Sequence, residues 1–223
     1  FVTAYYALVT QGRLAPGERV LIHAAAGGVG LAAVQIAQWV GAEIFATAGN
    51  PAKRAFLHDL GIEHVMDSRT LAFADTVLER THGRGVDVIL NSLAGEFIPR
   101  GMEILAPYGR FLEIGVRDIY QNSPLGLGAF AKRIAFFAIM VGADMPGFSA
   151  LWREVVQHVA AGHLRPLPQR VFPITEVAEA VRYMAQARHI GKIVVAQQHE
   201  GLSVPDAAPG GSVARRSQAG TGL

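Results

Sequence analysis

Cysteine is absent from the 223-residue chain, which excludes disulfides, thiol nucleophiles and thiolate metal sites. A strong excess of one charge is also lacking, because 20 basic and 18 acidic residues leave a formal net charge of +2. The basic residues are scattered, so we expect no nucleic-acid partner. No apolar run is as long as a membrane span, and no secretory signal pattern is visible. We therefore expect a cytoplasmic protein without a membrane partner.

Apolar residues make up 51% of the chain, enough for a substantial core, and they fall into short strand-like runs. The runs cover residues 19–24, 43–48, 64–68, 86–92, 110–115 and 134–140. Helix-like stretches begin near Gly28, Pro51, Leu71 and Gly95, and residues 1–12 also have a helical pattern. This alternation predicts an α/β fold with a doubly wound parallel sheet, that is, a Rossmann-like domain.

The pattern changes after Gly147. A helix is expected over residues 149–164, followed by a proline-punctuated stretch, a second helix over 175–188 and a strand over 191–196. Thr175 is the expected N-cap of the second helix, with Glu176 in its first turn. Residues 199–223 are rich in Gly, Ala, Ser and Pro, so they are interpreted as a flexible tail or an interdomain linker. The first residue is Phe and not Met, so we expect a fragment of a longer chain.

The stretch AAAGGVG lies between the first predicted strand and helix. Gly27 and Gly30 occupy the second and third positions of a G-x-G-x-x-G pattern, with Ala25 at the first. Gly27 would let the backbone approach a pyrophosphate, Gly30 would let helix and strand pack closely, and the helix start would offer N–H groups to the anion. The alternative is a purely structural turn, but the strand and helix on either side favour nucleotide binding.

The acidic residue that usually marks an NAD site is missing. That residue lies about twenty positions past the turn and accepts a hydrogen bond from the ribose. Here Asn50 is neutral, Lys53 and Arg54 follow, and Arg69 is available at the end of the next strand. Cations at this edge suit the 2′-phosphate of NADP, so the sequence predicts NADPH as the cofactor. The alternative is a solvated helix start.

Segments 17–57, 68–96 and 109–115, with the blocks AAAGGVG, NSLAGE and FLEIG, resemble the enoyl reductase domains of type I polyketide synthases and animal fatty acid synthases. These domains belong to the zinc-free quinone-reductase branch of the medium-chain dehydrogenases. The resemblance extends to about Gln197. It implies NADPH-dependent reduction of an α,β-unsaturated thioester on an acyl carrier protein, without a metal. The implied partners are that carrier and other domains of the same multienzyme, and a homodimer is left open.

The resemblance also implies a division of the chain and a set of site residues. Residues 1–165 would be the NADP-binding domain, residues 166–198 a C-terminal return segment of a barrel-like substrate domain, and residues 199–223 the tail. Together with the glycine turn and the cations, it predicts a cofactor-lining set: Thr3, Ala4, Ala25, Gly27, Gly28, Val29, Gly30, Gly49, Asn50, Lys53, Ser68, Arg69, Asn91, Ser92, Leu93, Ile114 and Gly115.

The chain departs from the family where a proton donor is expected. Val116 occupies the family's lysine position, and the family's distant aspartate falls near residues 140–142, two residues before Asp144. Val116 cannot donate a proton. Neighbours on an extended segment point to opposite sides, so Arg117 should not take over the role of the lysine, and we expect it to be a surface cation. Lys132, Asp144 and Arg117 remain weak candidates, and the catalytic group is unassigned.

Two alternative functions stay open. Val116 suggests a degenerate, non-reducing domain kept for structural reasons, and the fold also suits a free NADPH quinone oxidoreductase. His23 lies just before the glycine turn and could contact a phosphate or serve as a hydrogen-bonded part of the core. The histidines show no metal-ligand spacing with carboxylates, so no metal site is expected. Ser92 lacks the glycine setting of a hydrolase nucleophile.

Overall fold

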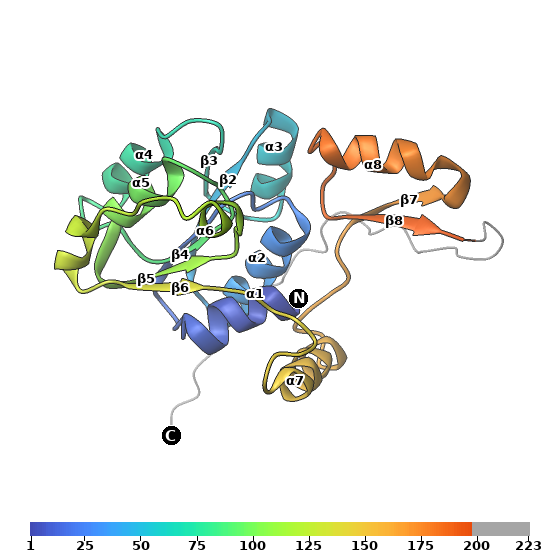
Figure 1. Cartoon of the computed structure of the whole chain (residues 1–223), viewed down its shortest axis with the longest axis horizontal. Helices are drawn as coiled ribbons and strands as arrows, with labels where there is room; N and C mark the ends of the chain where they lie inside the picture. Colours follow the sequence, from blue (N-terminus) through green and yellow to red (C-terminus); the bar gives the residue numbers. More distant parts are fainter. Residues whose placement is uncertain (198–223) are drawn as a thin grey trace, which may run out of the picture.

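A six-stranded parallel sheet forms the centre of the computed structural model, which describes residues 1–197 (Figure 1). The strands lie in the order β3-β2-β1-β4-β5-β6, and each neighbouring pair is parallel. Their bounds are β1 Arg19–Ile22, β2 Glu43–Ala48, β3 His64–Asp67, β4 Val86–Asn91, β5 Leu105–Glu113 and β6 Ala135–Ala138. The strand order reverses between β1 and β4, as in doubly wound dinucleotide-binding folds, so the predicted fold class is confirmed.

Helices cover both faces of the sheet. One face packs against α1 (Val2–Tyr5), the π-helical turn η1 (Tyr6–Gln11), α2 (Gly28–Val40), α3 (Pro51–Asp59) and α7 (Phe148–Ala160). The other face packs against α4 (Phe73–Arg80), α5 (Phe97–Glu103) and the 3₁₀ turn η2 (Leu127–Lys132). Side chains alternate between the two cores along each strand: Val88 and Leu90 of β4 join the first, and Ile89 joins the second.

The helix boundaries follow from local sequence. Asn50 caps α3 by accepting a hydrogen bond from the Lys53 N–H at 2.9 Å, and Pro51 takes the first helical position. Gly41 ends α2 in the left-handed conformation, with φ of 85°. Within residues 1–197, no helix is long and apolar enough to cross a membrane.

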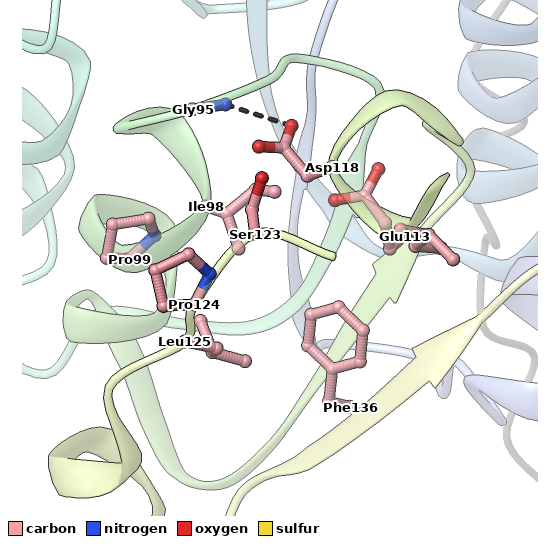
Figure 2. Close-up of a pocket in the computed structure, with 10 residues that line it drawn as sticks. Gly95, Ile98, Pro99, Glu113, Asp118, Ser123, Pro124, Leu125 and Phe136 are labelled. Atoms are coloured by element: carbon pink, nitrogen blue, oxygen red, sulfur yellow. Dashed lines mark hydrogen bonds between the residues drawn. The ribbon is translucent and has the colours of Figure 1, made fainter. Parts of the chain in front are cut away.

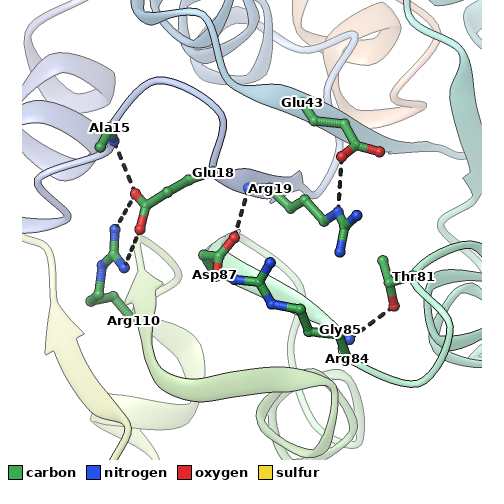
Figure 3. Close-up of polar contacts among 9 residues, drawn as sticks. All are labelled: Ala15, Glu18, Arg19, Glu43, Thr81, Arg84, Gly85, Asp87 and Arg110. Carbon is green, nitrogen blue, oxygen red and sulfur yellow. Dashed lines mark hydrogen bonds and ion pairs between the residues drawn. The ribbon is translucent and has the colours of Figure 1, made fainter.

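Polar contacts join the strands at the amino edge of the sheet (Figure 3). Arg110 of β5 donates two hydrogen bonds to the carboxylate of Glu18, at 2.9 and 2.6 Å. Asp87 of β4 accepts from the backbone N–H of Arg19 at 2.9 Å and from the Arg84 side chain at 2.8 Å. Paired charges therefore link the strands at the edge opposite the glycine turn.

The C-terminal elements form a separate unit beside α3 (Figure 1). β7 (Gln169–Pro173) and β8 (Lys192–Ala196) make a two-stranded parallel sheet, with η3 (Ile174–Glu176) and α8 (Val177–Ala185) between them. The predicted N-cap was wrong: Thr175 lies inside the 3₁₀ turn, and Glu176 takes the cap position without a side-chain hydrogen bond. The division at residues 165 and 166 stays a prediction, and the predicted tail over 199–223 lies outside the described residues.

Candidate nucleotide-binding site

The glycine turn joins the end of β1 to the start of α2, as the sequence predicts. A Cβ on Gly30 would lie 2.5 Å from both the Ala24 carbonyl oxygen and the Ala25 Cα, so only glycine fits there. Gly27 is the N-cap, and no side chain caps the first turn of α2. A 13-residue helix that begins this way presents backbone N–H groups to an anion. Ala25 is fully buried and contributes backbone only.

Three predicted residues meet where β2 and β3 end. A Cβ on Gly49 would lie 3.4 Å from both Ser68 Oγ and Arg69 Nε. Arg69 is exposed, and its own N–H donates to Asp67 at 2.8 Å. Asp67 also pairs with Arg54 at 3.1 Å, so the nearest carboxylate already has a cation. The edge next to Gly49 therefore keeps a guanidinium available for an anionic group.

Lys53 lies at the same edge and is largely buried. Its side chain is 9% exposed, and its ammonium group donates to the Ala187 carbonyl at 2.7 Å. Burial lowers the pKa of Lys53, and the nearby Arg69 lowers it further. A buried ammonium group beside a second cation is typical of a site that receives a phosphate.

Residues before β8 close over the glycine turn, and sequence analysis missed their role. The Gly191 N–H donates to the Ala26 carbonyl at 2.9 Å, and Gly191 forms a β-bridge with Gly27. A Cβ on Gly28 would lie 2.9 Å from Nζ of Lys192, which places a cation beside the first turn of α2. Only the folded topology brings Lys192 to this position, although a lysine at the start of an apolar strand was a weak signal.

Two further groups lie near this return segment. The Nδ1 atom of His189 is buried without a hydrogen-bond partner. Burial lowers the pKa of His189, and Lys53 and Lys192 lower it further. Thr3 is half-buried and Ala4 is buried on α1, which packs against α2. The structure thus places Lys192 beside the glycine turn and α1 against the helix that follows it.

The ends of β4 and β5 bring the remaining predicted residues together. Asn91 and Glu113 are register partners, and the Ile114 N–H donates to the Asn91 carbonyl at 2.9 Å. Ser92 is exposed, whereas Leu93, Ile114 and Gly115 are half-buried. These loops follow the carboxyl ends of two central strands, where ligands bind in doubly wound sheets.

Glu113 is a second residue that sequence analysis missed. Its carboxylate is 2% exposed and accepts hydrogen bonds from the Asn91 amide at 2.5 Å and the Gly115 N–H at 2.6 Å. Burial raises the pKa of Glu113 to about 7, although both hydrogen bonds oppose the increase. Asp118 adds to it. A buried polar residue within the apolar FLEIG run was the available signal.

A small pocket adjoins Glu113 on the side of α5 (Figure 2). Its volume is ≈ 190 Å³, and its walls are mostly apolar, with Ile98 and Phe136 among them. The carboxylates of Glu113 and Asp118 lie close together on one side in the figure. Asp118 accepts a hydrogen bond from the Gly95 N–H at 3.1 Å.

The segment after β5 is helical, so the expectation of an extended chain there was wrong. Val116 is the N-cap of α6 (Arg117–Tyr120), and Arg117 is exposed at its first position. The hydrogen bond from the Tyr120 N–H to the Val116 carbonyl, at 3.0 Å, closes this turn. Val116 is 42% exposed. The alternation argument therefore does not apply to Arg117.

The other two donor candidates lie in different places. Lys132 donates to the carbonyls of Glu103 and Leu105, at 2.5 and 3.2 Å, so it lies at the amino end of β5, away from the glycine turn. This position does not support a role in proton transfer. Asp144 is exposed beyond the carboxyl end of β6, and Met140 is 48% exposed in the same segment.

Comparisons with known proteins agree with this geometry. A family model described as zinc-binding dehydrogenase matches residues 60–195. A phenolphthiocerol/phthiocerol polyketide synthase protein of Mycobacterium tuberculosis is 49% identical over 213 residues, which is 94% of this chain and 10% of that protein. The chain thus spans about a tenth of the length of the curated relatives it matches.

Solved structures extend the comparison. The nucleotide-binding subdomain of the enoylreductase domain of PpsC from Mycobacterium tuberculosis is 52% identical with a TM-score of 0.68, over 74% of this chain and 94% of that one. The CurK enoyl reductase is 50% identical with a TM-score of 0.77, over 87% of this chain and 59% of that one. The doubly wound fold and the glycine turn are typical of a dinucleotide-binding domain. The chain belongs to the zinc-binding dehydrogenase family, among the medium-chain enoyl reductases of type I polyketide synthases.

The family description names zinc, but this chain does not provide a suitable donor set. It contains no cysteine. Within residues 1–197, no three His, Asp or Glu side chains form a group that could hold a metal ion. We therefore derive no step from zinc.

Proposed function

We propose that this chain is the cofactor-binding half of an NADPH-dependent enoyl reductase that acts on an α,β-unsaturated thioester bound to an acyl carrier protein. Its partners would be that carrier, the other domains of the same polyketide synthase and, in a dimer, a second copy. The observation that carries the proposal is the cluster at the end of β2, where Ser68 and Arg69 flank Gly49, Lys53 lies close enough to Arg69 to feel its charge, and the nearest carboxylate is paired with Arg54.

The residues fit a dinucleotide from one end to the other. The glycine turn and the start of α2 suit the pyrophosphate, and Lys192 lies beside them. The cationic cluster suits the adenosine 2′-phosphate, since guanidinium and ammonium groups form strong charge-assisted hydrogen bonds with phosphate. The loops after β4 and β5 are left for the nicotinamide half, because the dinucleotide crosses the sheet at its switch point.

The proposed reaction needs positioning more than reactive side chains. Bound NADPH supplies a hydride to the β-carbon while the carbon–carbon π electrons move toward the thioester oxygen, and a proton then joins the α-carbon. This chain would contribute orientation of the nicotinamide and exclusion of water. It offers no lysine at position 116, so the proton comes from another group or from water.

Substitution of Arg69 tests the cofactor assignment most directly. We expect wild-type protein to bind NADPH more tightly than NADH, because Arg69 meets only the 2′-phosphate. Arg69→Ala should weaken NADPH binding by roughly tenfold or more, the effect of one charge-assisted hydrogen bond, and leave NADH binding unchanged. Lys53→Ala should act in the same direction but also loosen the Ala187 contact. Fluorescence titration of each nucleotide measures these affinities.

Arg80→Ala is the matched control, because Arg80 is exposed at the end of α4. It removes the same charge and should change neither affinity. Equal affinities for NADPH and NADH in wild-type protein would contradict the cofactor assignment.

One observation favours a second candidate, a non-reducing structural domain. Val116 removes the family's usual proton donor, and its side chain is 42% exposed at the start of α6. A domain of this kind would still fold and could still bind nucleotide. The two candidates therefore differ in turnover and not in cofactor binding.

A further inference from the structure

Asn91 and Glu113 are the last residues of two neighbouring strands. β4 and β5 pair them directly, and their exposed fractions are 0% and 2%. The amide Nδ2 of Asn91 donates to Oε2 of Glu113 at 2.5 Å. The last backbone hydrogen bond between the two strands runs from the Ile114 N–H to the Asn91 carbonyl, and the side-chain bond links the strands at the same end.

Each partner also holds the loop that follows its own strand. Asn91 accepts from the Leu93 N–H at 3.2 Å and donates to the Leu93 carbonyl at 2.7 Å. Glu113 accepts from the Gly115 N–H through Oε1 at 2.6 Å. A Cβ at position 115 would lie 2.7 Å from that Oε1 atom, so the carboxylate and the glycine depend on each other.

The carboxylate occupies an unfavourable environment. Burial raises its pKa to about 7, and Asp118 of α6 raises it further. The neighbouring pocket residues from α5 and β6, Ile98 and Phe136, do not titrate and offer no cation. An unpaired buried carboxylate destabilises a fold, so stability alone does not account for Glu113.

We propose that Glu113 is a positioning residue that, through Asn91 and Gly115, holds together the two loops that receive the nicotinamide half of the cofactor. This inference rests on the proposed function, because holding the loops affects cofactor binding only if the chain binds a nicotinamide cofactor there. The ionised carboxylate can accept both hydrogen bonds. A protonated carboxyl group turns one oxygen into a donor, which sets it against either the Asn91 amide or the Gly115 N–H. Cofactor affinity therefore falls as the carboxylate takes up a proton.

The test compares Glu113→Gln with a swapped pair, Asn91→Asp combined with Glu113→Gln. In Glu113→Gln, one amide nitrogen must face another donor, so one contact is lost. In the swapped pair, the new Gln donates to the new Asp and still accepts from the Gly115 N–H, so both contacts of position 113 can form again. The bond that is lost instead is the one to the Leu93 carbonyl, within the loop after β4. Glu96→Gln, at an exposed glutamate whose side chain does not cap α5, is the matched control.

Two measurements are made on the full chain. NADPH affinity is measured by fluorescence titration between pH 6 and 8, and amide hydrogen exchange of residues 91–95 and 113–116 is measured without nucleotide. We expect Glu113→Gln to weaken binding at pH 8 by roughly tenfold and to speed exchange in both segments. Its affinity should change less with pH than that of wild type, because the introduced glutamine does not titrate. Titration of the 2′-phosphate is common to both proteins and does not contribute to the difference. The swapped pair should regain protection of residues 113–116, because the link between the strands and the Gly115 contact form again, and Glu96→Gln should match wild type.

The outcomes separate this inference from the proposed function. If wild-type protein binds no NADPH, the proposed function is wrong. The hydrogen-exchange measurement would still show whether Glu113 holds the two loops, because it is made without nucleotide. Unchanged hydrogen exchange in Glu113→Gln would show that Glu113 does not hold the two loops together. Faster exchange with unchanged NADPH affinity would overturn the positioning role, as would a swapped pair in which residues 113–116 exchange as fast as in Glu113→Gln.

Discussion

At the residue scale, His23 shows how burial couples a single side chain to pH. It is 3% exposed, its Nδ1 lies 3.0 Å from the Thr47 hydroxyl, and Nε2 has no hydrogen-bond partner. The ring meets Phe73 edge-on at 4.8 Å between centroids. These surroundings support a core role for His23 and not a phosphate contact. Burial lowers its pKa to about 3.

We predict that the free energy of unfolding falls with decreasing pH because of His23. From the ordinary pKa of 6.5 downwards, the unfolded chain takes up a proton that the folded chain accepts only near pH 3. The unfolded state is therefore favoured across this range. In urea titrations from pH 7 to 4.5, His23→Gln should lose stability less steeply than wild type. The exposed His82, changed to Asn, is the control, and equal slopes for wild type and His23→Gln would contradict the prediction.

Residues differ in how far the sequence predicts their roles. Lys53 and Arg69 could be proposed because the relevant signal, an absent acid followed by cations, is local. For Glu113 the sequence offers only a polar residue within an apolar run, and its role arises when β5 lies beside β4 and places it opposite Asn91. Lys192 reaches Gly28 through a contact across most of the chain. No residue pattern in one segment contains that information.

At the scale of elements, the link between β1 and α2 depends on one glycine. We predict that Gly30→Ala prevents the turn from closing, because its methyl group would lie 2.5 Å from backbone atoms of Ala24 and Ala25. Those atoms cannot move without displacing α2. The variant should have a markedly lower melting temperature and little NADPH binding, as measured by thermal denaturation and fluorescence titration.

Gly128→Ala provides the control for Gly30→Ala. A Cβ at position 128 meets no atom within 4 Å, so the same change of one methyl group should leave stability and binding near wild type. Nearly equal melting temperatures for the two variants would show that close packing at Gly30 does not hold the turn.

Most strands and helices could be predicted, and the exceptions have physical reasons. Strands buried on both faces stand out as short apolar runs, and each predicted run overlaps a strand, although β5 begins at Leu105, five residues before the predicted run 110–115. The π-helical form of residues 6–11 was not predicted, because π and α turns share nearly the same residue preferences. The short α6 was missed because four residues carry no periodic signal. Thr175 was one residue away from the actual cap because a 3₁₀ turn precedes α8.

At the scale of the whole molecule, exposed apolar side chains concentrate on the C-terminal elements. Val171 of β7, Val181 and Met184 of α8, and Trp152 of α7 are between 45% and 53% exposed. The CurK match leaves 41% of that enoyl reductase unmatched, since this chain covers 59% of it. Both facts fit the proposal that a substrate-binding half lies elsewhere in the parent protein.

We therefore predict that residues 1–223 bind NADPH but do not reduce a crotonyl thioester. In the proposed two-domain enzyme, the substrate half would complete the cleft that orients the acyl chain and excludes water, so the cofactor half alone should not turn over. NADPH binding is measured by fluorescence titration, and turnover by loss of NADPH absorbance. The intact parent protein is the positive control. Reduction by this chain alone at the parent's rate would show that the cofactor half is sufficient.

The parent protein also decides between a reductase and a structural domain. A positioned acid contributes roughly 10²- to 10⁴-fold to proton transfer, whereas hydride transfer depends on orientation of the nicotinamide. If the parent is a reductase that lacks its usual donor, Val116→Lys combined with Met140→Asp should speed α-protonation more than hydride transfer. Deuterium incorporation at the α- and β-carbons follows the two steps separately. The control pairs Val116→Leu with Met140→Leu, which keeps both sites apolar and should leave both rates near wild type. If neither wild type nor the Lys/Asp variant oxidises NADPH although both bind it, the domain is structural, because restoring the donor did not restore chemistry.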